Sequence, residues 1–128
     1  MIFKERYQDI LRTESEIVVN LGHSVEVKNN VIEKACITIT GHFGNCVSVE
    51  LICKGCCPLG LYNSTDNVGY IIRCLIELFD QENDCGCNFD ILNGVPIRLV
   101  FDNHKCIAIG HFMEDRFILI EDLMHLNQ

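Results

Sequence analysis

A chain of 128 residues, 48% of them hydrophobic, carries enough apolar side chains for one core and too few for two independent ones. Its 18 acidic residues outnumber the 10 basic ones, and the formal charge of -8 argues against direct binding of DNA or RNA, because a surface of that sign repels phosphate groups. No signal peptide and no apolar run of membrane-spanning length is visible, so we expect one domain over residues 1–128, cytoplasmic and without membrane contact.

Apolar residues recur at helical spacing near the N-terminus, which predicts a short amphipathic helix over residues 2–12. Residues 17–21 and 24–28 then flank a Gly-His pair at 22–23, an arrangement that favours a small hairpin. The two asparagines at 29–30 are typical of a turn that follows such a hairpin.

Two strands are expected next, because apolar and polar residues alternate over residues 34–40 and again over 47–51. The loop between them, residues 41–45, contains two glycines, so the strands should pair antiparallel. A turn-rich break follows over residues 53–60. Ser, Thr and Asp at positions 64–66 can then cap the free N–H groups at the start of a helix.

One long amphipathic helix is predicted at about residues 66–80. Its apolar stripe consists of Ile71, Ile72, Leu75, Leu78 and Phe79. The helix should pack on the sheet through this stripe and end before the polar segment 81–87.

The C-terminal part has the clearest strand pattern, with apolar residues at every second position. Residues 95–101 and 106–112 should form a hairpin around Asp102-Asn103-His104, because Asn and Asp tolerate positive φ. A last helical turn is expected over residues 121–126. Together the elements predict an α+β fold, in which an antiparallel sheet carries the main helix and the short N-terminal helix.

Nine cysteines are a high and odd number, and without a signal peptide they indicate a reduced protein. Four of them lie on two short knuckles that could hold tetrahedral zinc. These are Cys53, Cys56, Cys85 and Cys87. The spacing of the second pair differs from that of a zinc knuckle, and cysteine is commonly buried, so we expect buried or loop thiols and no cofactor, with structural zinc as the alternative.

No catalytic arrangement stands out in the sequence. None of the five histidines has a local spacing that pairs it with a cysteine, and the adjacent carboxylates at 114–115 and 121–122 point in different directions. The glycines occur at turns and form no phosphate-binding loop. We therefore expect a binding protein rather than an enzyme.

A few arginines and aromatic side chains could form a site for a small anionic ligand. A guanidinium grips a phosphate through two hydrogen bonds, and an aromatic ring stacks on a base. The candidate ligand-binding residues are Arg73, Arg98, Arg116, His111, Tyr62 and Phe43, with Phe89 as a further aromatic.

Each arginine also has an alternative, purely structural interpretation. Arg73 could pair with Glu77 one helical turn away. Arg98 could form a cross-strand ion pair, and Arg116 could form a salt bridge with Glu114 or Asp115.

The segments GYIIRCL, LNGVPIR and IAIGHFMED follow one another in the second half of the chain. In this order, over residues 69–117, they resemble small phage proteins related to the Thoeris anti-defence sponges. The resemblance implies homo-oligomers whose subunit interfaces bind cyclic ADP-ribose-type or other cyclic nucleotide signals without cleaving them. The chain departs from the family pattern at residues 56–62, which replace a Gly- and aromatic-rich loop, and at Phe117, where the family has Trp. Residues 1–30 have no counterpart and are treated as an N-terminal extension.

The resemblance thus implies a phage or prophage counter-defence protein that acts in the host-cell cytoplasm as a nucleotide-binding sponge for immune evasion. The alternative is an anti-CRISPR-type inhibitor that binds a Cas nuclease through the N-terminal region or an acidic surface. The sponge predicts that the three arginines converge on a concave site shared between subunits. The inhibitor predicts a flat or convex patch of carboxylates such as Asp80, Glu82 and Asp84.

Overall fold

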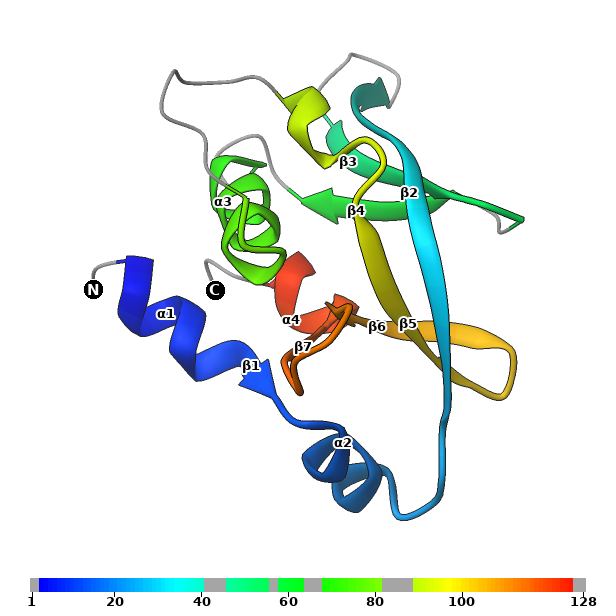
Figure 1. Cartoon of the computed structure of the whole chain (residues 1–128). Helices are drawn as coiled ribbons and strands as arrows, with labels where there is room; N and C mark the ends of the chain where they lie inside the picture. The colour runs from blue at the N-terminus through cyan, green and yellow to red at the C-terminus, as the bar shows by residue number, and fades with distance from the viewer. Residues whose placement is uncertain (1–2, 41–45, 56–57, 64–67, 82–88, 126–128) are drawn as a thin grey trace.

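The computed structural model describes residues 3–40, 46–55, 58–63, 68–81 and 89–125, and in this part of the chain seven strands form one sheet (Figure 1). The strands lie in the order β1-β7-β6-β5-β2-β3-β4, and all neighbours pair antiparallel. The α+β class predicted from the sequence is confirmed. In chain order the elements are α1 (Phe3–Ile10), β1 (Leu11–Arg12), α2 (Glu14–Leu21), β2 (Glu26–Thr40), β3 (Cys46–Cys53), β4 (Leu59–Asn63), α3 (Val68–Leu78), the 3-10 helix η2 (Phe89–Leu92), β5 (Pro96–Asp102), β6 (Lys105–His111), β7 (Phe117–Leu119) and α4 (Ile120–Met124).

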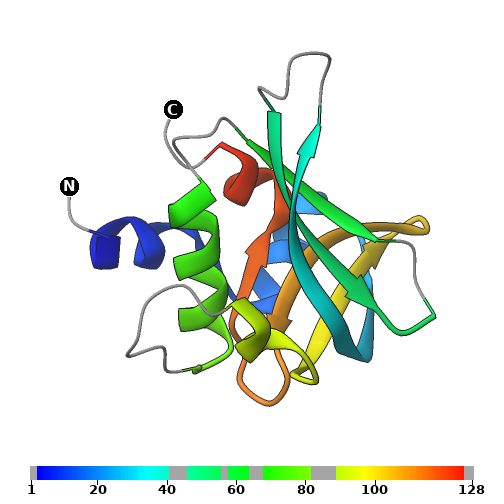
Figure 2. The same cartoon turned by 90° about the horizontal axis from the view of Figure 1, so that it is seen from above.

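Strand β2 joins the two halves of the sheet. Its residues 26–31 pair with β5, whereas the remainder pairs with β3. The register shifts between Ile32 and Lys34, and an irregularity of this kind increases the local twist. The sheet curls around β2, so that its two halves partly enclose one side of the molecule (Figure 2).

Helix α3 covers the enclosed side of the sheet and forms the main core with it. The helix buries its apolar stripe at Ile71, Cys74, Leu75 and Leu78. These side chains belong to the same cluster as Leu51 of β3, Leu61 of β4 and Leu99 of β5, all fully buried. Burial of one such side chain stabilises the fold by about 2 kcal/mol. Helix α1 lies beside α3, with the Arg6 guanidinium 5.4 Å from the centre of the Tyr70 ring (Figures 1 and 2).

Helix α3 ends at Leu78, two residues before the predicted boundary. Asp80 adopts a left-handed conformation with φ of 55°, its N–H donates to the Glu77 carbonyl, and the Gln81 N–H donates to the Ile76 carbonyl. These two bonds form a Schellman cap, in which glycine is the usual left-handed residue. An aspartate there is strained by about 1 kcal/mol. The expected capping residues 64–66 lie outside the described part of the chain.

Two predictions for the N-terminal region are wrong. Residues 17–21 belong to helix α2 instead of a hairpin strand, because Thr13 and Glu16 form a reciprocal capping box and Gly22 ends the helix at φ 78°. Residues 29–30 continue β2 instead of forming a turn. Asn30 fits within the strand because its side chain donates to the Lys54 carbonyl.

The C-terminal hairpin is confirmed as β5 and β6. Its turn contains Asn103 at φ 51° and His104 at φ 72°, the positive values that a tight hairpin turn requires. The expected last helical turn is α4. The short strands β4 and β7 were not predicted, because sequences of 5 and 3 residues are too short to show a periodic pattern.

A second, smaller core lies on the opposite face of the sheet, under α2. Ile17 of the helix packs there with Val100, Ala108 and Phe117. Gly110 is required beside them, because a Cβ atom at this position would lie 2.2 Å from Cδ1 of Phe117. No helix in the described part of the chain is long and apolar enough to cross a membrane.

Candidate functional site

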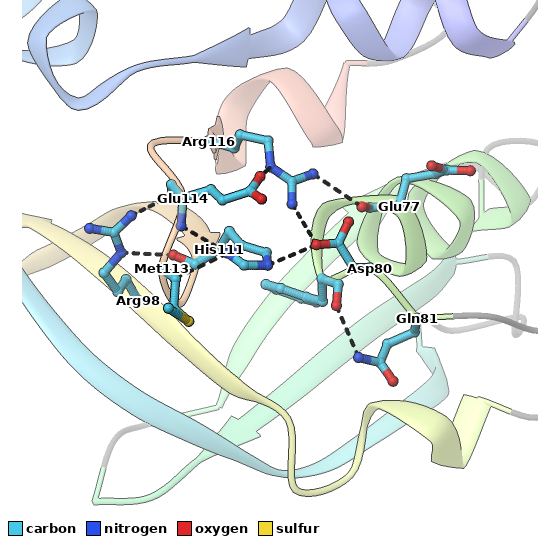
Figure 3. Close-up of polar contacts among 9 residues, drawn as sticks. Glu77, Asp80, Gln81, Arg98, His111, Met113, Glu114 and Arg116 are labelled. Carbon is cyan, nitrogen blue, oxygen red and sulfur yellow. Dashed lines mark hydrogen bonds and ion pairs between the residues drawn. The ribbon is translucent and has the colours of Figure 1, made fainter.

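The loop from β6 to β7, residues 112–116, is held in place by a polar network around His111 (Figure 3). The His111 Nδ1 atom accepts hydrogen bonds from the backbone N–H groups of Met113 and Glu114, both at 3.0 Å. In the neutral ring the proton therefore lies on Nε2, which is 3.0 Å from Oδ2 of Asp80. We call residues 112–116 the tip.

Arg116 connects the tip to the end of α3. Its Nη2 atom donates to Asp80 Oδ2 at 2.8 Å, and its Nε atom lies 2.7 Å from Oε2 of Glu114. Burial opposes the charge, but the carboxylates of Asp80 and Glu114 together with Tyr7 raise the pKa of Arg116 above its ordinary value. Burial also raises the pKa of Tyr7, on α1, to about 12. The expected salt bridge between Arg116 and Glu114 is thus present.

Arg98 supports the tip from the neighbouring strand β5. Its Nε atom donates to the His111 carbonyl at 2.7 Å, and its Nη2 atom donates to the carbonyl of Glu114. The guanidinium also lies 4.7 Å from the centre of the Phe117 ring, across the space that Gly110 leaves open. The prediction of a cross-strand ion pair for Arg98 is wrong as far as the described residues go, since the hydrogen bonds of its guanidinium go to backbone carbonyls.

The structure therefore brings together three of the predicted ligand-binding residues, Arg98, Arg116 and His111, but it engages them in supporting the tip. Arg73 lies exposed on α3. Phe43 lies outside the described residues, as do the side chains of Tyr62 and Phe89. The sequence did not indicate Asp80 as a partner of the arginines, because its role depends on the position at which α3 ends.

A groove at the other end of the sheet was not predicted at all. It lies between β4 and the start of β6, beside α4, and has a volume of about 670 Å³. Strand β4 ends the sheet, and β7 pairs with β6 only at residues 108–110, so both walls include strand edges that the described sheet leaves unpaired. The groove is lined by Leu21, Pro58, Leu59, Gly60, Lys105, Cys106, Ile107, Leu119, Ile120, Glu121, Met124 and His125.

The walls of the groove are mostly apolar, with a few ionisable side chains among them. Lys105 is an exposed ammonium group, His125 an exposed imidazole, and Glu121 an exposed carboxylate. The thiol of Cys106 is half-buried and donates to the carbonyl of Ala108 at 3.6 Å. No local sequence signal could have identified this site, because its residues come from segments far apart in the chain.

The predicted zinc ligands are only partly described. Cys53 is buried in the main core, whereas Cys56, Cys85 and Cys87 lie outside the described residues. Within the described ranges, no group of three His, Cys, Asp or Glu residues could hold a metal ion. The expectation of buried thiols is confirmed for Cys53 and for Cys74, and burial raises the pKa of the Cys74 thiol to about 12.

Comparisons with protein-family models, with curated proteins and with solved structures find no match to this chain. The arguments for a function therefore come from the geometry of the tip and the groove.

Proposed function

We propose that this protein is a binding protein of the phage counter-defence type, which sequesters a small anionic ligand, such as a cyclic nucleotide, without cleaving it. The observation that supports this proposal is the groove between β4 and β6. Its volume of about 670 Å³ lies within the range of about 300–1,000 Å³ that small-molecule sites occupy. Apolar walls suit a base, and Lys105 suits a phosphate.

The groove is a better candidate than the arginine cluster, because the arginines already have partners. A phosphate that approached Arg116 would have to displace Asp80 or Glu114, and one that approached Arg98 would have to displace two backbone carbonyls. Lys105 is exposed, and the ion pairs formed among the described residues do not include it. We accordingly assign the ligand to the groove, and we assign Arg98, Arg116 and His111 to the support of the tip.

A panel of cyclic nucleotides, including cyclic ADP-ribose isomers and cyclic di- and trinucleotides, tests the proposal through the melting temperature of the reduced protein. A ligand that binds only the folded state stabilises it by about 2.7 kcal/mol at a hundredfold excess over its Kd. Lys105→Ala should reduce this shift, whereas Lys34→Ala, which removes an exposed lysine of β2 away from the groove, should leave it unchanged. The absence of a shift with every compound would reject the sponge.

The alternative, an inhibitor that binds a host CRISPR nuclease, has one observation in its favour. Helix α2 in the N-terminal region exposes Val19 by 76% and Leu21 by 37%, next to the acidic residues Glu14 and Glu16. The proposed carboxylate patch has less support, since Asp80 is paired with Arg116 and His111, and Glu82 and Asp84 lie outside the described residues. Binding of a purified Cas nuclease that is lost in Val19→Asp would favour the inhibitor.

A further inference from the structure

The tip presents apolar side chains on a rigid backbone. Met113 is 79% exposed and Phe112 is 42% exposed. Around them the backbone groups are satisfied within the loop, since the Arg116 N–H donates to the Glu114 carbonyl and the His111 N–H donates to the Arg116 carbonyl. An ordered loop loses little conformational entropy when it binds a partner, and exposed apolar side chains can serve as anchors in an interface. The tip therefore has the properties of a docking surface.

A shallow hollow lies directly beside the tip, on the outer face of the sheet. Its volume is about 460 Å³. It is lined by Asn29, Asn30, Val31, Lys54, Pro96 and Phe112. The strand registers place Val31 opposite Pro96, and they bring Lys54 and Phe112 to the two ends of the same cross-strand row. Six large apolar side chains are exposed in the described part of the chain; two of them, Val31 and Phe112, line the hollow, and a third, Met113, follows Phe112 in the tip.

The charges at the two ends of this row are opposite. Lys54, at the β3 end, is exposed. Glu114 and Asp115, at the tip end, are exposed carboxylates; Glu114 pairs with Arg116 through Oε2, and Asp115 accepts the Glu14 N–H through Oδ1. A rotation by 180° about an axis through the middle of the row exchanges its ends, so it would place the lysine of one copy against the carboxylates of another. The same rotation would place the protruding Met113 of each copy over the hollow of its partner.

We propose that a second copy of this chain docks on this face and forms a symmetric dimer. In this dimer Met113 of each subunit fills the hollow beside Val31 and Pro96 of the other, and Lys54 pairs with the partner's tip. The polar network around His111 holds the tip in the shape that this contact requires. The proposal does not depend on the groove, whose lining shares no residue with the hollow.

Sedimentation of the ligand-free protein over a wide range of concentration tests the dimer. Wild type should change from monomer to dimer as the concentration rises. Met113→Asp should weaken the dimer about tenfold or more, as expected for a central apolar anchor. Val19→Asp is the matched control, because Val19 is exposed to a similar degree, 76%, but lies on α2, and it should dimerise like wild type.

Lys54→Glu tests the charge pairing independently of the apolar contact. It places like charges at both ends of the interface, so its dimer should be weaker than that of wild type in dilute salt and should recover as salt screens the repulsion. The wild-type dimer should instead weaken as the salt concentration rises, because salt screens the attraction between Lys54 and the partner's tip.

If the wild-type protein remains monomeric at every concentration, the proposal is overturned, and the tip would then be a docking surface for a different protein. An oligomer that Met113→Asp weakens no more than Val19→Asp would also overturn it. Circular dichroism of each variant confirms that the fold is retained. Because neither variant alters the groove, failure of the dimer and failure of ligand binding are separate results.

Discussion

The tip and the groove are built from opposite kinds of residues. The tip and the side chains that hold it include Arg98, His111 and Arg116, which attract attention in the sequence, and nearly every polar group described there meets a partner within the fold. The groove has mostly apolar walls and strand edges that the sheet leaves unpaired. Charged residues in a recognisable segment can thus serve stability, because a guanidinium donates hydrogen bonds to backbone carbonyls as well as to phosphate.

The largest effect is expected where the tip joins the smaller core. Gly110→Ala should destabilise the protein by about 3 kcal/mol, because the new methyl group collides with the fully buried Phe117 ring over which Arg98 lies. Urea unfolding measures this change. Gly69→Ala is the control: nothing lies within 4 Å of its Cβ position in the exposed part of α3, and it should stabilise the helix by about 0.5–1 kcal/mol. Equal effects of the two substitutions would contradict the packing argument.

Arg98→Ala should separate the roles of the two regions. The loss of two bonds to carbonyls and of the contact with Phe117 should destabilise the fold by about 2 kcal/mol. Any ligand that raises the melting temperature of wild type should still raise that of Arg98→Ala by a similar amount. Lys105→Ala should show the reverse, a normal melting temperature and a reduced ligand shift. If Arg98→Ala abolishes the shift while the variant remains folded, the ligand belongs at the tip.

Asp80 combines backbone strain with a favourable contact, and two substitutions distinguish them. Asp80→Ala should destabilise by about 1 kcal/mol, because it keeps the left-handed strain and loses the partly exposed pairs with Arg116 and His111. Asp80→Gly loses the same pairs but relieves the strain, so its stability should be close to that of wild type. Thermal unfolding of both variants measures the difference. A glycine variant less stable than the alanine variant would contradict the left-handed strain assigned to Asp80.

The smallest effect concerns His23, whose Nε2 atom lies 2.8 Å from Oδ1 of Asp102 at the β5–β6 turn. This hydrogen bond raises the pKa of His23 above its ordinary value. Because the pKa of His23 is higher in the folded than in the unfolded state, its protonation stabilises the folded protein fully at pH values below the unfolded-state pKa. This contribution disappears as the pH rises through the folded-state pKa. An NMR titration should show the raised pKa in wild type and an ordinary one in Asp102→Asn. If the pKa of His23 is equally high in Asp102→Asn, its hydrogen bond with Asp102 is not the cause of the raised pKa.

The sequence by itself determined the elements whose signals are local and repeated. The alternation along β2, β3, β5 and β6 and the apolar stripe of α3 predicted the α+β class, because burial of one face imposes a period on a strand or helix. Local signals were also present where the prediction failed. Thr13 and Glu16 form the capping box that makes residues 14–21 helical, and the β-branched residues in that segment obscured it.

Tertiary structure alone decided what the polar residues do. Asp80 and Arg116 lie 36 positions apart, and their contact depends on where α3 ends and how β7 is placed. Likewise, Lys105 and Leu59 face one groove only because the sheet curls around β2 and α4 fills part of the space between its ends. Periodicity records whether a side chain is buried, but the partner of a polar group depends on distances between segments that no local pattern contains.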